Sequence, residues 1–309
     1  MTRVCIAVAI LGTGSFAFGQ DDEPSENGAK FSVLSKKMAA EYEISVDGTP
    51  LKLKQESLLR WTNPAVGEIY GDVYVWADDG RPAAIASVYR WYRPYDHMTH
   101  EFQSLSTGPL RATRDGQPDW ATQDPGLKWQ PLTDVPAPRA TPTARLVQLR
   151  QLARLFTARI VEKDQTVSEL RLVPQPLVRY TSDKWKVTDG AMFSFAKGTD
   201  PEALLLLEVR DGASGPAWFY AIARSNNQPL KASLRDEEVW SVKRDRATSF
   251  SSPIVATFKT VDVVLMCGGK EVCAYQAKDG KKLYAVDQIG FRMIIIDTET
   301  QTLEHNIPV

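Results

Sequence analysis

The sequence predicts an α+β fold, mainly antiparallel β, made of two tandem repeats that each pack one helix on a curved antiparallel sheet. Three observations lead to this prediction. A helix-like apolar periodicity opens each half of the chain, and most other segments alternate at period two between turns rich in Gly and Asp. In addition, residues 51–89 align with residues 170–208 without a gap, which indicates an internal duplication.

Residues 1–19 have the pattern of a cleaved signal peptide. Arg3 provides the basic start, an apolar run follows, and Ala17 and Gly19 are the small residues that a signal peptidase requires. The polar linker at residues 20–30 ends the apolar run before it is long enough to cross a bilayer. We therefore expect a periplasmic or extracellular protein with no transmembrane segment in its mature chain.

The first repeat, residues 31–130, opens with a helix predicted over residues 30–42. The apolar residues of this helix recur every three or four positions: Phe31, Leu34, Met38 and Tyr42. The segments that follow contain alternating or β-forming residues and are predicted strands: 51–54, 73–76 and 85–89. A polar Asp-Asp-Gly turn at 78–80 separates the last two.

The second repeat, residues 143–248, follows a connector at residues 131–142 that contains four prolines and is expected to be extended. A helix is predicted over residues 143–156, with Thr143 as its N-cap. Strands are predicted at 170–172 and 192–195.

Residues 203–209 allow two interpretations. The preceding Asp200-Pro201-Glu202 resembles a helix start, and a run of leucines suits a buried helix. The aligned residues 85–89 of the first repeat follow an Asp-Gly turn and contain β-forming residues. We favour a strand.

The alignment of the two repeats contains nine identical positions, where chance would give about two or three. The identical pairs are Leu51/Leu170, Leu53/Leu172, Leu58/Leu177, Arg60/Arg179, Thr62/Thr181, Gly71/Gly190, Ala77/Ala196, Pro82/Pro201 and Ala84/Ala203. Aromatic residues also align, as in Trp61/Tyr180, Trp76/Phe195 and, after a shift of one residue, Trp120/Trp240. Aromatic residues shared by both repeats are expected to pack in the core.

Residues 249–309 are predicted to form a C-terminal β extension. It contains four predicted strands: 257–265, 272–276, 282–286 and 291–296. Cys267 and Cys273 flank a Gly-Gly turn in this extension, and in an oxidising compartment they are predicted to close a hairpin as a disulfide. Their five-residue gap matches neither C-x-x-C redox chemistry nor common zinc spacings.

Two resemblances extend this interpretation. Residues 170–180, Leu-Arg-Leu-Val-Pro-Gln-Pro-Leu-Val-Arg-Tyr, and residues 199–208 resemble an uncharacterised family of exported planctomycete-type bacterial proteins, which implies no known activity. The layout of each half, with a helix, strands like those at 51–61 and an aromatic strand after Gly71, is similar to the periplasmic lipoprotein carriers. That resemblance implies half-open barrels that hold acyl chains under their helices.

Several function classes lack their usual sequence features. The 37 basic and 38 acidic residues leave no basic surface for nucleic acid. The mature chain contains no Walker loop, no dinucleotide fingerprint after a strand, no G-x-S-x-G and no H-E-x-x-H. We therefore predict no cofactor.

Five residues are candidates for ligand binding. Arg60 and Arg179 are shared by the two repeats, so they are interpreted either as partners of a carboxylate within the fold or as an anion-binding pair. Trp91, Tyr92 and Tyr95 belong to a segment without an aligned counterpart, and a ligand-contacting aromatic loop is one interpretation of it. An ordinary surface hairpin is the other.

The same segment, residues 90–101, contains the candidate metal ligands His97, His100 and Glu101. If the segment is helical, the two histidines lie on one face and a carboxylate completes a site. If it is extended, an offset of three positions sends the imidazoles to opposite faces. The strand before it and the apolar residues after it favour a loop that enters a strand.

Together these features predict an exported, non-enzymatic binding or envelope-associated protein, whose partner is an unidentified ligand or envelope component. Three alternatives stay open: a metal-assisted hydrolase that uses the two histidines and Glu101, a lipid or lipoprotein carrier, and a carbohydrate-binding module in which aromatic rings stack on sugars.

Overall fold

The computed structural model describes residues 26–243, except 66, 94–95, 162–165, 213–214 and 227, and the backbone of six strands between residues 254 and 308. The predicted signal peptide and the polar linker as far as residue 25 lie outside the described residues. No helix in the described part of the chain is both long and apolar enough to span a membrane.

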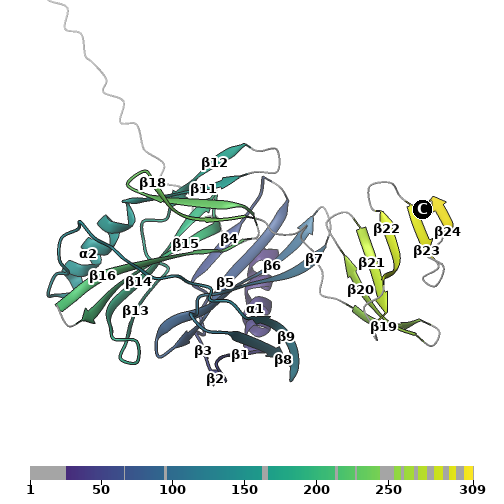
Figure 1. Cartoon of the computed structure of the whole chain (residues 1–309), viewed down its shortest axis with the longest axis horizontal. Helices are drawn as coiled ribbons and strands as arrows, with labels where there is room; N and C mark the ends of the chain where they lie inside the picture. Colours follow the sequence, from purple (N-terminus) through teal and green to yellow (C-terminus); the bar gives the residue numbers. More distant parts are fainter. Residues whose placement is uncertain are drawn as a thin grey trace, which may run out of the picture.

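The described residues of the first half form one helix and a series of strands (Figure 1). These elements are α1 (Glu26–Ala40), β1 (Tyr42–Val46), β2 (Thr49–Pro50), β3 (Lys52–Leu53), β4 (Leu59–Thr62), β5 (Glu68–Asp78), β6 (Arg81–Arg93), β7 (His97–Ser104), β8 (Leu110–Arg114), β9 (Gln117–Thr122) and β10 (Gln130–Pro131). The long β5 and β6 pair as a hairpin through the Asp-Gly turn that the sequence predicted.

The second half has a similar series. Its elements are α2 (Pro142–Ala153), β11 (Phe156–Val161), β12 (Val167–Leu172), β13 (Val178–Ser182), β14 (Val187–Lys197), β15 (Asp200–Gly212), β16 (Gly215–Arg224), β17 (Leu230–Leu234) and β18 (Glu237–Val242). The fold is therefore mainly antiparallel β with two helices in the described residues, as expected from the sequence.

The strands of each half curl around one helix. In the first half they form two sheets, ordered β2-β1-β8-β9 and β3-β5-β6-β7, with β4 also paired to β5. In the second half one sheet has the order β10-β16-β15-β14-β12-β11-β17-β18, with β13 paired to β14. The two halves differ in the number of sheets because of β12. This strand is continuous and pairs with both β11 and β14, whereas in the first half β2 pairs with β1 and the separate β3 pairs with β5. The short β10 comes from the connector and extends the second sheet at β16.

Both helices begin before the predicted residue. The first runs from Glu26 to Ala40, and Tyr42 already belongs to a strand. The second begins at Pro142 rather than at 143, and the N-cap is Thr141, whose hydroxyl accepts a hydrogen bond from the amide of Ala144 (3.3 Å). The backbone N–H of the first helical residue has no partner within the helix, so proline, which lacks this N–H, is well suited to that position. The helix therefore starts at Pro142.

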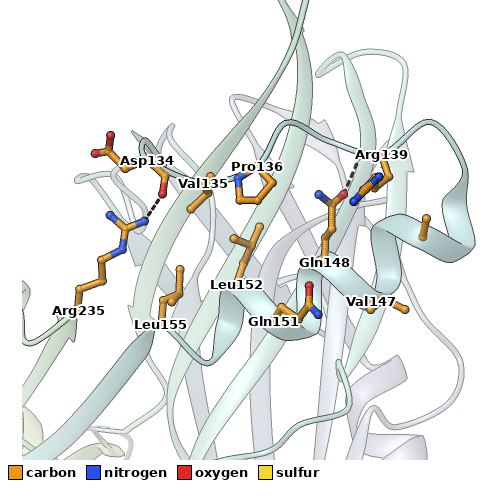
Figure 2. Close-up of a pocket in the computed structure, with 11 residues that line it drawn as sticks. Asp134, Val135, Pro136, Arg139, Val147, Gln148, Gln151, Leu152, Leu155 and Arg235 are labelled. Atoms are coloured by element: carbon orange, nitrogen blue, oxygen red, sulfur yellow. Dashed lines mark hydrogen bonds between the residues drawn. The ribbon is translucent and has the colours of Figure 1, made fainter.

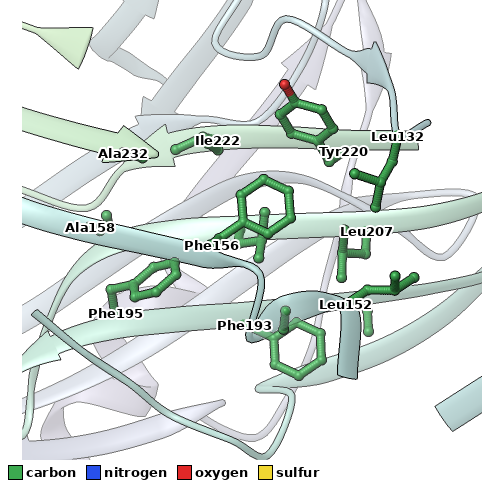
Figure 3. Close-up of a cluster of buried hydrophobic side chains, with 14 of the residues drawn as sticks. Leu132, Leu152, Phe156, Ala158, Phe193, Phe195, Leu207, Tyr220, Ile222 and Ala232 are labelled. Atoms are coloured by element: carbon green, nitrogen blue, oxygen red, sulfur yellow. The ribbon is translucent and has the colours of Figure 1, made fainter. Parts of the chain in front are cut away.

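Three apolar clusters hold the fold together. The α1 cluster includes Phe31, Tyr74 and Trp76, and the α2 cluster, drawn in Figure 3, includes Phe156, Phe193, Phe195, Leu205 and Leu207. The middle cluster joins the two halves, because Val73 and Ile85 from the first sheet pack with Met192, Leu204 and Leu206 from the second. The curled strands of the two halves are thus packed back to back, and the helix of each half lies on the opposite face.

This arrangement explains residues 203–209, which belong to the strand β15 as favoured. Leu205 and Leu207 face the α2 cluster, whereas Leu204 and Leu206 face the middle cluster. A strand that is buried on both faces has an uninterrupted apolar sequence, which resembles that of a buried helix.

Two glycines lie beneath large rings at the same place in each sheet. Gly71 pairs with Trp61 and Gly190 with Tyr180. A Cβ atom at either glycine would overlap the ring of its partner. Only hydrogen at these positions lets the rings lie flat across the strand.

The predicted disulfide between Cys267 and Cys273 is absent, so that prediction was wrong. The C-terminal strands β19 (Ile254–Phe258), β20 (Val261–Cys267), β21 (Glu271–Gln276), β22 (Lys282–Asp287), β23 (Arg292–Ile296) and β24 (Leu303–Pro308) pair in sequence order. The register pairs Cys267 with Val272, and Met266 with Cys273. Because adjacent positions along a strand belong to opposite faces, this register places the two cysteines on different faces of the sheet.

Candidate binding sites

A groove of about 590 Å³ lies between α2, the connector and the turn that joins β17 to β18 (Figure 2). It is lined by Asp134, Val135, Pro136, Arg139, Ala144, Val147, Gln148, Gln151, Leu152, Leu155 and Arg235. The connector forms one wall and α2 forms the other, so the groove exists only because the chain between the halves runs back across the helix.

Gln148 on α2 holds the connector in this place. Its side-chain oxygen accepts a hydrogen bond from the amide of Arg139 (2.7 Å), and its side-chain nitrogen donates to the carbonyl of Ala137 (2.9 Å). The indole of Trp218 donates to the carbonyl of Pro136 (3.1 Å). Proline has no amide to pair with a strand, so side chains rather than a sheet ladder position this segment.

The middle of the groove is mainly apolar, with Gln151 also in its lining, and an arginine lies at each end (Figure 2). Val135, Pro136, Leu152 and Leu155 lie between Arg235 at one end and Arg139 at the other (Figure 2). The guanidinium of Arg235 donates to the carbonyls of Thr133 (3.3 Å) and Asp134 (2.6 Å), which fixes it at the rim. The Asp134 carboxylate turns away from α2 (Figure 2) and accepts a hydrogen bond from the Thr133 hydroxyl (3.2 Å).

Arg60 and Arg179 do not form an anion site. Arg60 on β4 pairs with the buried carboxylate of Asp72 (3.0 Å), which also accepts a hydrogen bond from Ser35 on α1 (2.6 Å). Arg179 on β13 pairs with the buried Asp189 (2.6 Å).

The carboxylate of Asp189 is shared with Arg145 on α2, whose guanidinium lies 2.8 Å from it. Arg60 and Arg179 therefore each neutralise a carboxylate that ties a helix to its sheet. Of the two interpretations that the sequence allowed for Arg60 and Arg179, the contacts agree with the first, in which each arginine pairs with a carboxylate within the fold.

The aromatic candidates are divided by the sheet. Trp91 faces the middle cluster, whereas the hydroxyl of Tyr92 reaches the carbonyl of Asn27 on α1 (3.5 Å). Adjacent residues of β6 point to opposite faces, so these two rings do not form one sugar-stacking surface. Tyr95 lies outside the described residues.

The metal candidates are divided in the same way, because β7 is extended. His97 stacks on Trp91 (ring centroids 5.3 Å apart), whereas Nδ1 of His100 lies 2.5 Å from the Tyr42 hydroxyl on the α1 side. Burial lowers the pKa of His100. Glu101 faces the second half of the chain, and no group of three potential metal ligands occurs among the described residues. The three predicted ligands therefore do not assemble into a metal site.

A smaller pocket, of about 100 Å³, lies between the two halves and contains Glu101 and Trp91. Asp200, at the start of β15, lines the same pocket. Burial raises the pKa of Asp200 to about 7, and burial together with the charge of Asp200 raises the pKa of Glu101 to about 7. Two carboxyl groups with raised pKa values therefore line one pocket.

No family model, curated protein or solved structure matches this chain. Function is therefore inferred from the groove and the pocket themselves.

Sequence reasoning identified two residues of the pocket, Trp91 and Glu101, but not Asp200. One signal was available in the alignment of the repeats. Arg81 and Asp200 occupy aligned positions with opposite charges, which marks a place where the two halves differ in chemistry. The residues of the groove carried no comparable signal, because most of them belong to the unaligned connector or to the exposed side of a helix.

Proposed function

We propose that the protein is an exported binding protein that holds an amphipathic ligand, with an apolar chain and an anionic end, in the groove beside α2. The observation that carries this proposal is a volume of about 590 Å³ with an apolar middle and an arginine at each end. Binding sites for small molecules commonly have volumes of about 300–1,000 Å³.

The lining chemistry supports both parts of the ligand. Burial of an alkyl chain against the apolar middle contributes about 0.8 kcal/mol for each methylene group. The guanidinium groups of Arg139 and Arg235 suit a carboxylate or a phosphate, which accepts paired hydrogen bonds from them.

The proposal is related to the lipoprotein-carrier resemblance, with one difference. In that class the acyl chains lie under the helix, inside the half-open barrel. Here Phe156, Phe193 and Phe195 fill the space under α2, so the ligand is proposed to lie between α2 and the connector. Export through the predicted signal peptide, residues 1–19, is part of the same proposal and places the protein where lipids and other envelope components are available.

We further infer that the two halves are copies of one ancestral unit. Aligned positions pair in equivalent registers, as in Leu53 with Trp76 and Leu172 with Phe195, and both β5–β6 and β14–β15 carry an irregularity just before the turn. On this inference the connector is the added element, and the groove is a feature of the second half alone.

A fluorescence titration with dansylated undecanoic acid tests the proposed function. We expect saturable binding to the wild-type protein, and we expect Val147→Trp, which fills the groove, to weaken it by about tenfold or more. The matched control is Val33→Trp, because both valines are exposed on a helix (51% and 75%) but only Val147 lines the groove.

The anionic end is tested separately. Arg139→Gln should weaken binding of the dansylated acid by about tenfold through loss of a charge-assisted contact. Arg111→Gln, in an exposed position of β8, should leave the binding unchanged. Absence of saturable binding, or equal binding by the Val147→Trp variant, would overturn the proposal. Equal binding of a dansylated alkyl amine would overturn its anionic part.

A further inference from the structure

The pocket between the two halves has aromatic walls and an acidic interior. It is lined by Trp61, Asn63, Ile69, Ser87, Tyr89, Trp91, Glu101, Asp200, Ser225 and Asn226. It shares no residue with the groove beside α2, so an inference about it is independent of the proposed function.

Strand alternation builds the walls. Ser87, Tyr89 and Trp91 alternate along β6 and face the same side, and Glu101 on β7 pairs directly with Ser87. Trp61 crosses above them, with its indole donating to the Ser87 hydroxyl (3.0 Å) and its ring 5.3 Å from that of Tyr89. Three aromatic rings therefore line the same pocket as the two carboxyl groups.

In the described part of the chain, the charges that act on the pair are those of Asp200 and Arg224. Burial raises the pKa of both carboxyl groups, the charge of Asp200 raises that of Glu101 further, and the charge of Arg224 lowers it. The charge of Arg224 acts on Glu101 from β16, but its guanidinium also donates to the carbonyl of Asn226 (2.5 Å). Glu202, which accepts a hydrogen bond from Asn226, adds a further negative charge near the Tyr89 ring.

The position that aligns with Asp200 in the first half of the chain is Arg81, and its contacts indicate which chemical group fits between aromatic rings and a carboxylate. Arg81 begins β6 as Asp200 begins β15, and each pairs with the residue three positions before it. The guanidinium of Arg81 lies 2.7 Å from the buried carboxylate of Glu208, and its carbon is 4.6 Å from the ring centre of Trp129 and 4.9 Å from that of Trp185. There the chain itself places a cation between aromatic rings and a carboxylate.

The pocket also combines aromatic rings with a carboxylate, but Asp200 stands at the position that aligns with Arg81, so the pocket has no arginine there. We propose that it binds a small organic cation, a guanidinium or primary ammonium group, between the rings of Trp61, Tyr89 and Trp91 and the carboxylates of Glu101 and Asp200. Aromatic faces attract cations of this kind, and two carboxylates accept their several N–H donors. The volume of about 100 Å³ admits the head group of such a molecule.

Calorimetric titration of the full chain with methylguanidinium and with n-butylammonium chloride, at about pH 8 and constant ionic strength, tests the proposal. We expect saturable binding of at least one of these cations, and none of the neutral analogues methylurea and n-butanol. Glu101→Gln and Asp200→Asn should each weaken the binding by about tenfold or more. Glu43→Gln, which changes an exposed glutamate on β1, is the matched control and should have no effect. Thermal unfolding of each variant checks that it is folded.

Two further titrations identify the source of the cation and test a metal ion as the alternative ligand. Tighter binding of the peptide Gly-Arg-Gly than of methylguanidinium identifies a basic peptide side chain as the ligand, whereas weaker binding identifies a free amine or guanidine. Absence of binding by both cations, equal binding of the neutral analogues, or unchanged binding by folded variants overturns the proposal. Binding of Ca²⁺ that the two variants abolish, without binding of organic cations, overturns it in favour of a metal site.

Discussion

Removal of the half-buried charges of Glu101 and Asp200 should stabilise the protein, and only at neutral and alkaline pH. The pKa of Glu101 is raised from 4.5 to about 7, and that of Asp200 from 3.8 to about 7, with burial as the main cause of both. Glu101→Gln and Asp200→Asn replace each carboxyl group by a neutral amide of the same shape.

The sign follows from the protons that each state binds. Below the ordinary pKa values both states are protonated, and the carboxyl groups cost nothing. As the pH rises toward 7, the unfolded chain releases its protons while the folded chain retains them, so the free energy of unfolding falls. Above about pH 7 the loss is complete, and it is on the order of 3 kcal/mol for each carboxyl group. Because Asp200 contributes to the raised pKa of Glu101, the two losses are not independent.

Urea unfolding of the wild type and the two variants at about pH 4 and about pH 8 measures this effect. We expect Asp200→Asn to increase the free energy of unfolding by roughly 3 kcal/mol at the higher pH and to leave it nearly unchanged at the lower. Glu43→Gln, the exposed control, should change neither value by more than about 0.5 kcal/mol. A variant that is less stable than the wild type at the higher pH would refute the reasoning, because it would mean that the carboxylate is satisfied inside the fold.

Two further predictions concern the packing of the halves, and both are measured by urea unfolding at neutral pH. Gly71→Ala and Gly190→Ala should each destabilise the protein by about 1–3 kcal/mol, because the new methyl group meets a ring, whereas Gly212→Ala has room and should be nearly neutral. Unequal effects at the first two glycines would contradict their equivalent packing. Arg81→Met should cost about 1.5–3 kcal/mol because it removes one partner of the buried Glu208, which keeps Arg210 (2.6 Å), and Glu208→Gln in the same chain should restore part of the loss. A stable single variant would show that this ion pair does not hold the halves together.

The sequence predicted those candidate residues whose placement depends on the alternation within one strand or hairpin. Trp91 and Glu101 lie on one face of the β6–β7 hairpin, and their period-two spacing from neighbouring residues is a local property. The extended alternative for His97 and His100 followed from the same spacing. Asp200 and the groove were missed because each depends on a segment that is distant in the chain: the back of the other sheet in one case and the connector in the other.

What the sequence alone determined is therefore the local structure: one helix at the start of each half, and the long hairpins with their Gly-containing turns. Hydrophobic periodicity, turn residues and caps act between near neighbours, so they are visible in a short window. The tertiary structure decided which faces of the sheets meet, and so buried both sides of Leu204–Leu207 and brought two carboxyl groups together. It also decided the register that separates the two cysteines, because strand register depends on the pairing of whole strands and not on the turn residues alone.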